Sequence, residues 1–166
     1  MGLFLSPLNL STGLGLASIS LAFAFGQIFW GVTQPIAGAY ADRFGAGRVL
    51  LLGISLVALG TAITPMMTST WGLILTIGVL AAGGAGIAGP AVLMSACMRF
   101  VPEDKQNMAV AIVNAGGSLG VFMMAPLTVA LMVSFGWTNA MLALALMVLL
   151  ALPSAWLFRG NSQHAK

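Results

Sequence analysis

The sequence predicts an all-α membrane protein, a polytopic helical bundle with about five transmembrane helices. The first observation is composition: 60% of the residues are hydrophobic and 5% are charged, which leaves too little polar surface to cover a water-soluble globule. The mean hydropathy of +1.05 agrees with this. The second is that the charged residues cluster between apolar stretches, each near the ~20 residues that a helix needs to cross the hydrocarbon layer.

Charge clusters and turn residues divide the chain into five apolar segments. The first connection, DRFGAGR, and the third, RFVPEDKQN, are charged, whereas the second, PMMTST, and the fourth, SFGWTN, are not. Because lipid offers no partner to backbone N–H and C=O groups, each segment is expected to be helical. The expected spans are residues 13–41, 49–66, 72–98, 108–135 and 138–158.

All basic residues fall on one side of these spans. The positive-inside rule places basic loops in the cytoplasm, so we expect the N-terminus outside and the C-terminus inside a bacterial-type plasma membrane. Trp71 and Trp137 then lie in the aromatic belt of the outer interface. The basic residues are Arg43, Arg48, Arg99, Lys105, Arg159 and Lys166.

The first residues have two interpretations. GLFLSPL, residues 2–8, is typical of the last turns of a preceding helix that ends near Pro7, in which case an upstream part is missing. The alternative is a secretory signal peptide, because Ala22, Phe23 and Ala24 have the small-x-small form of a cleavage site. The missing basic n-region argues against a signal peptide.

Small residues recur at four-residue spacing inside two spans. Gly78 and Ala82 lie in the third span, and Gly116 and Gly120 lie in the fourth. Such faces let helix backbones approach closely, which allows helices to associate in lipid. Static packing and helices that slide or rock both fit this pattern. Four prolines inside the spans are able to kink these helices: Pro35, Pro90, Pro126 and Pro153.

Polar side chains are rare within the spans. At ~100° per residue, Gln27 and Gln34 project to one face of the first span, and Asn114, Ser118 and Thr128 to one face of the fourth. A carboxamide in hydrocarbon is costly without a partner, so we expect these faces to point inward, either lining a polar cavity or bonding between helices. The residues expected to line a cavity or interface are Gln27, Gln34, Gly86, Pro90, Met94, Asn114 and Ser118.

Several kinds of site are excluded by the residues present. The spans contain no ionisable group near their middle, so this chain alone supplies no proton relay. A single cysteine, Cys97, forms neither a disulfide framework nor a cysteine metal cluster. The only histidine, His164, lies in the tail, where it provides no base for an intramembrane protease. A net charge of +3 without a basic stripe argues against nucleic acid. The sequence therefore predicts no enzyme, no metal site and no cofactor.

The charged turn GAYADRFGAGR contains a glycine, an aspartate four residues later, an arginine, and then a glycine and a basic residue. This pattern resembles the signature between the second and third helices of the major facilitator superfamily. Gly47 stands where that family usually has a basic residue. The matching residues are Gly38, Asp42, Arg43, Gly45 and Arg48.

Two further stretches carry the resemblance. GVLAAGGAGIAGPAVL, residues 78–93, is similar to the family's glycine-rich fourth helix. Residues 99–137 resemble the loop and fifth helix of the branch that contains monocarboxylate transporters and oxalate:formate antiporters. The resemblance implies that residues 1–166 form a partial N-terminal six-helix half, whose spans are the family's helices two to six.

This resemblance implies a secondary transporter, a symporter or antiporter that works by alternating access on a small organic anion such as a monocarboxylate. It also implies that Asp42 pairs with basic residues, here Arg48 and Arg99, and with a helix end in the opposite half, which holds the outward-facing state closed. A role in topology alone is the alternative. Expected partners are the lipid bilayer, the solute, and a missing C-terminal half or a second subunit. Efflux of a drug-like solute and a non-transporting scaffold stay open.

Overall fold

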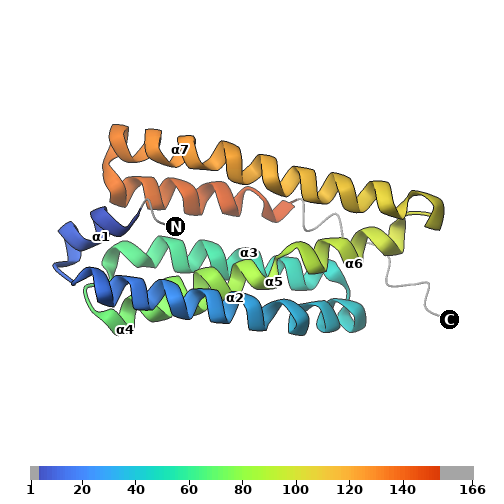
Figure 1. Cartoon of the computed structure of the whole chain (residues 1–166), viewed down its shortest axis with the longest axis horizontal. Helices are drawn as coiled ribbons and strands as arrows, with labels where there is room; N and C mark the ends of the chain where they lie inside the picture. Colours follow the sequence, from blue (N-terminus) through green and yellow to red (C-terminus); the bar gives the residue numbers. More distant parts are fainter. Residues whose placement is uncertain (1–3, 154–166) are drawn as a thin grey trace.

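The computed structural model describes residues 4–153, except for the side chains of residues 96–100. All elements in this part of the chain are helical. The long helices lie side by side along the longest axis of the molecule (Figure 1). These findings confirm the all-α, polytopic class.

The first helix, α1 (Leu5–Thr12), is longer than the sequence suggested. A helix end near Pro7 was expected, and this is wrong. Pro7 lies in the first turn, where backbone N–H groups have no acceptor within the helix, so a proline costs no hydrogen bond there. The helix instead ends at Gly13, whose φ of 68° is left-handed and whose N–H bonds to the Asn9 carbonyl over 3.1 Å. The Asn9 carboxamide donates to the Leu14 carbonyl over 2.8 Å and so fixes the link to the next helix.

Two long helices follow. The first is α2 (Leu16–Phe44), which contains Pro35 without a break, and the second is α3 (Ala46–Ile63), which continues into the 3₁₀ turn η2 (Thr64–Met66). Gly45 separates α2 from α3 with a φ of 92° and donates its N–H to the Ala41 carbonyl over 3.0 Å. Few side chains tolerate that backbone conformation, so a glycine is needed for the sharp reversal.

The next crossing is built from four pieces: α4 (Thr70–Leu73), the π-helix η3 (Ile74–Ala82), α5 (Gly83–Ile87) and α6 (Pro90–Phe100). Ser69 caps α4, because its hydroxyl oxygen accepts from the Gly72 N–H over 3.1 Å. The chain leaves helical geometry at Ala88 (φ −86°, ψ 13°). Pro90 follows directly and has no N–H to continue the helix, so α6 starts afresh.

The last long element, α7 (Gln106–Leu149), follows the 3₁₀ turn η4 (Glu103–Lys105) and bends at Gly136. The φ of 78° and ψ of 162° at Gly136 are not helical. We call residues 106–135 the first arm of α7 and residues 137–149 the second arm. Figure 1 shows the second arm returning beside the first. Four stretches of the described chain are long and apolar enough to span a membrane, and the Gly136 bend divides the last of them into two arms.

Connections gather at the two ends of the bundle (Figure 1). At the right of the view lie η4, with Glu103, Asp104 and Lys105, and the α2–α3 turn, with Asp42, Arg43 and Arg48 in the helix ends beside it; we call this the charged end. At the left, α1, α4 and the Gly136 bend form the uncharged end.

Apolar side chains form one cluster near each end. The charged-end cluster contains Ala37, Ala41, Ala46, Val49, Leu50 and Val92. The uncharged-end cluster contains Leu8, Ile19, Ala22, Leu73, Ile74 and Ile77. Together they hold α1, α2, α3 and the four-piece crossing in one bundle.

The first arm of α7 differs from these helices. Of its residues only Thr128 is buried, and the Thr128 hydroxyl donates to the Met124 carbonyl of the same helix over 2.6 Å. Phe122 is 76% exposed. The first arm is therefore the open side of the bundle.

Candidate functional site

The charged end contains the family-like turn. Asp42 and Arg43 lie in the last turn of α2, and Arg48 lies in the first turns of α3; all three side chains are exposed. The rings of Tyr40 and Phe44 stack beside them with centroids 5.5 Å apart. The turn therefore presents its charges to solvent, while the neighbouring Ala41 and Ala46 are buried.

Asp42 contacts α6. The Ser95 hydroxyl donates to Asp42 Oδ1 over 2.8 Å, which joins helices that are 53 residues apart in the sequence. Nothing in the sequence around Ser95 marks it as a site residue. The side chain of Arg99 lies outside the described residues, so its pairing with Asp42, like that of Arg48, stays a prediction.

Two polar faces were expected to point inward. Gln27 is exposed and Gln34 is half-buried on α2, and Asn114 and Ser118 are exposed on the first arm. In Figure 1, α2 and the first arm lie on opposite sides of the bundle, so the structure does not bring these faces together. Of the polar residues expected to point inward on these two faces, Thr128 alone is buried.

Three residues of the four-piece crossing were expected to line a cavity or interface. Gly86 is buried against α2, where a side chain would meet the Thr33 hydroxyl and, at 2.6 Å, the Trp30 carbonyl. Pro90 is exposed at the start of α6, and Met94 is half-buried. Gly86 therefore forms a contact between helices of this chain.

The two faces of small residues that were expected to pack differ in their surroundings. In η3, Gly78 and Ala82 lie against Gly26 of α2: a Cβ built on Gly26 would be 3.2 Å from the Ala82 Cβ and 3.6 Å from the Gly78 Cα. In the first arm, a Cβ on Gly116 or Gly120 would have no neighbour within 4 Å. The first face is filled from within the chain, and a partner for the second stays a prediction.

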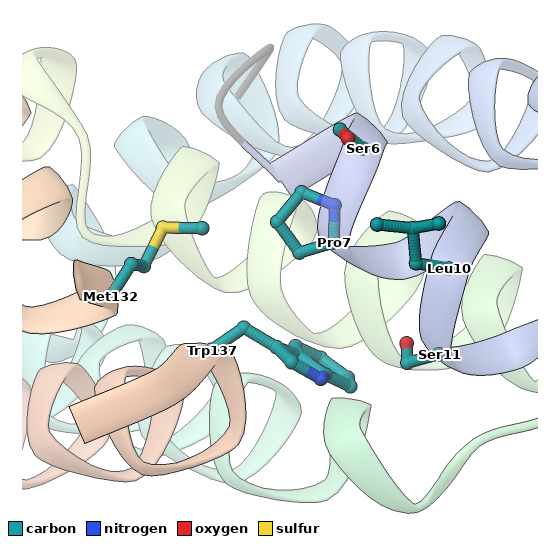
Figure 2. Close-up of a pocket in the computed structure, with 6 residues that line it drawn as sticks. All are labelled: Ser6, Pro7, Leu10, Ser11, Met132 and Trp137. Atoms are coloured by element: carbon teal, nitrogen blue, oxygen red, sulfur yellow. The ribbon is translucent and has the colours of Figure 1, made fainter.

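A cavity of about 390 Å³ opens at the uncharged end (Figure 2). Ser6, Pro7, Leu10 and Ser11 of α1 line one side, and Met132 and Trp137 of α7 line the other. Its lining contains no charged side chain, so it provides no counter-ion for an anion. The described residues also contain no group of three His, Cys, Asp or Glu side chains that could hold a metal ion.

Comparison with known proteins identifies the family. The whole chain, residues 1–166, matches the Major Facilitator Superfamily. The chain belongs to this family. An oxalate:formate antiporter from Oxalobacter formigenes is 31% identical over 125 residues, which are 75% of this chain and 29% of the relative. These findings confirm the resemblance that the charged turn and the glycine-rich segment predicted.

Two more members of the superfamily are similar. A gallate transporter from Pseudomonas putida is 28% identical over 159 residues, 94% of this chain and 34% of the relative. Monocarboxylate transporter 11 from Mus musculus is 28% identical over 126 residues, 76% of this chain and 28% of the relative. The chain thus spans about a third or less of the length of these relatives. Its family and helical content make it a multi-pass membrane protein.

Proposed function

We propose that this chain forms part of a secondary transporter that moves a small organic anion across a membrane by alternating access. The observation that carries the proposal is the family match over the whole chain, with relatives named for oxalate, formate, gallate and monocarboxylates. These solutes are small anions or carboxylic acids. Because the chain spans a minor part of each relative, we propose that further helices, in the same polypeptide or in a second subunit, complete the pathway.

The open side of the bundle supports this proposal. Asn114 and Ser118 are exposed in the middle of an apolar helix, and a carboxamide facing hydrocarbon without a partner is costly. Water or another helix therefore has to cover this face. In the proposed transporter the first arm borders the solute pathway, and the missing helices lie across from it.

Uptake measurements test the substrate class. Vesicles that contain the complete gene product, of which this chain is all or part, are expected to accumulate labelled oxalate, formate or gallate above empty vesicles. Asn114→Leu is expected to reduce uptake at least tenfold with an unchanged amount of protein in the membrane. Ser134→Ala, which changes an exposed serine at the far end of the same arm, is the control. Export of a lipophilic cation such as ethidium, with no anion uptake, would support drug efflux instead.

We also propose that the charged end is cytoplasmic, because Arg43, Arg48 and Lys105 lie there and the positive-inside rule applies to such short loops. In a Cys97→Ser background, single cysteines at the exposed positions Thr68 and Asn139 are expected to react with an impermeant thiol reagent added outside intact cells. A cysteine at Glu103 is expected to react only after the cells are opened. The reverse pattern would invert the orientation.

A further inference from the structure

Ser95, which contacts Asp42, lies in α6, directly after a break in the four-piece crossing. The Ala88 N–H bonds to the Gly84 carbonyl over 2.9 Å, and the Gly89 N–H bonds to the Gly86 carbonyl over 3.2 Å. After the break, the N–H groups of Val92 and Leu93 bond back to the Gly89 carbonyl. Gly89 is thus the joint between α5 and α6, and Pro90 contributes no N–H across it. The direction of α6 has to be fixed by contacts with other helices.

Helix α2 provides such contacts on both sides of the joint, and α3 and α7 also pack against α6. Before the joint, the Thr33 hydroxyl of α2 lies 3.2 Å from the Gly83 carbonyl of α5, and Gly86 packs against Trp30. After the joint, Val92 is fully buried in the charged-end cluster with Ala37 and Ala41 of α2. The continuous helix α2 therefore holds both pieces of the broken crossing.

Ser95 and Val92 both contact α2 from α6. Ser95 lies three residues after Val92, so both project from the same side of α6, and Asp42 follows the buried Ala41 on α2. The apolar cluster brings the two helices together, and the hydrogen bond closes the contact at the solvent-exposed end.

We propose that Ser95 is a positioning residue for Asp42. Its hydroxyl donates to Oδ1 of the carboxylate and so fixes the direction of that side chain at the end of α2. The same bond couples the Asp42 side chain to the angle of α6 at the Gly89 joint. When α6 swings at the joint, Asp42 loses this donor and its carboxylate reorients. The inference rests on the proposed function only for the role of Asp42 in holding the outward-facing state closed. The coupling between α2 and α6 is a property of this chain.

The coupling is tested with a thiol reporter on α6. Val92→Cys in a Cys97→Ser background places one cysteine at a fully buried position against α2 and α3, which N-ethylmaleimide reaches only when α6 moves away from these helices. The rate of labelling is measured on the chain in membrane vesicles. No transported solute is needed, so this result stands apart from the success or failure of the uptake experiment.

Ser95→Val and Ser95→Thr form a matched pair, because they have nearly the same shape and only threonine keeps the hydroxyl. Ser95→Val is expected to raise the labelling rate about two- to tenfold, the effect of losing one hydrogen bond, and Ser95→Thr is expected to stay near the wild-type rate. Ser95→Ala is expected to behave like Ser95→Val, and Ser134→Ala is the distant control. Gel filtration checks that each variant is folded.

A double-variant cycle decides whether Ser95 acts through Asp42. In an Asp42→Ala background, Ser95→Ala is expected to add no further increase in labelling. An equal increase in both backgrounds would overturn the proposal, because Ser95 would then act through another group. Equal rates for Ser95→Val and Ser95→Thr would overturn it as well, since the hydroxyl would be irrelevant.

Discussion

Two glycine-rich regions of this chain have opposite surroundings. Gly53 of α3 and Gly84 of α5 face each other: a Cβ built on either one would lie 2.8 Å from the carbonyl oxygen of the other. In the first arm of α7, Gly116, Gly117 and Gly120 would each carry a Cβ with no neighbour within 4 Å. The same residue type therefore marks a closed helix contact in one region and an open face in the other.

This difference shows what glycine spacing tells about a membrane helix. A row of small residues gives a helix the capacity for close approach, but it does not identify the partner. The closed contacts in α3, η3 and α5 use that capacity within the chain. The first arm also has small residues at this spacing, but no other helix of the chain packs against them. It carries the exposed Asn114 as well, and an exposed carboxamide makes a lipid-facing role costly. Three sets of variants test whether the two regions differ in packing in this way.

The largest expected effect is at the facing glycines. Gly53→Ala and Gly84→Ala are each expected to lower the free energy of unfolding by about 1–3 kcal/mol, because the new methyl group meets backbone atoms that cannot move aside. Unfolding of the purified chain by a denaturing detergent, followed by circular dichroism, measures this. Gly117→Ala is the control, since it also replaces a helical glycine. If Gly53→Ala and Gly117→Ala had the same stability, the closed contact would not exist in the membrane protein.

A smaller effect is expected from the hydroxyl that lies between α2 and α5. Thr33→Val removes a group that is 2.8 Å from the Phe29 carbonyl and 3.2 Å from the Gly83 carbonyl. The expected loss in the free energy of unfolding is about 0.5–1.5 kcal/mol. Thr33→Ser keeps the hydroxyl and is expected to lose less. A serine variant as unstable as the valine variant would assign the effect to packing rather than to the hydrogen bond.

The smallest effect on stability is expected in the open face. Gly116→Leu and Gly120→Leu have room for the new side chain and gain helix propensity, so the free energy of unfolding is expected to change by no more than about 1 kcal/mol and not to fall. The same variants are expected to reduce anion uptake, because the proposed partner helix approaches here. A loss of stability as large as that of Gly53→Ala would show that the arm is already packed in the membrane.

The helical class and the positions of the long apolar helices follow from simple rules. Lipid forces every long apolar segment into a helix, and a helix needs a definite length to cross it. Gly136 also follows a rule, because a glycine between two long apolar segments is a natural place for a bend. The family could be predicted because its signature residues lie close together in the sequence, in the charged turn from Gly38 to Arg48.

The contacts between helices could not be predicted in the same way. Ser95 has no local property that distinguishes it from other serines, and its bond to Asp42 depends on two helices meeting far apart in the sequence. The end of α1 at Gly13 was missed because Pro7 looked like a stop, although proline is accommodated in a first helical turn. Gly78 and Gly116 are each followed by a small residue four positions later, and only the fold separates the covered glycine from the open one.

The π-helix in the four-piece crossing affects how insertions and deletions act on this chain. Its nine residues, Ile74–Ala82, are wound more widely than an α-helix, since a π turn closes on the fifth residue rather than the fourth. Deleting one residue there lets a turn tighten to α geometry while the residues before and after it keep their facing partners. A deletion in the middle of α3 instead rotates every later side chain by ~100°. Differences in length among related chains are therefore expected to be tolerated in η3 and selected against in α3.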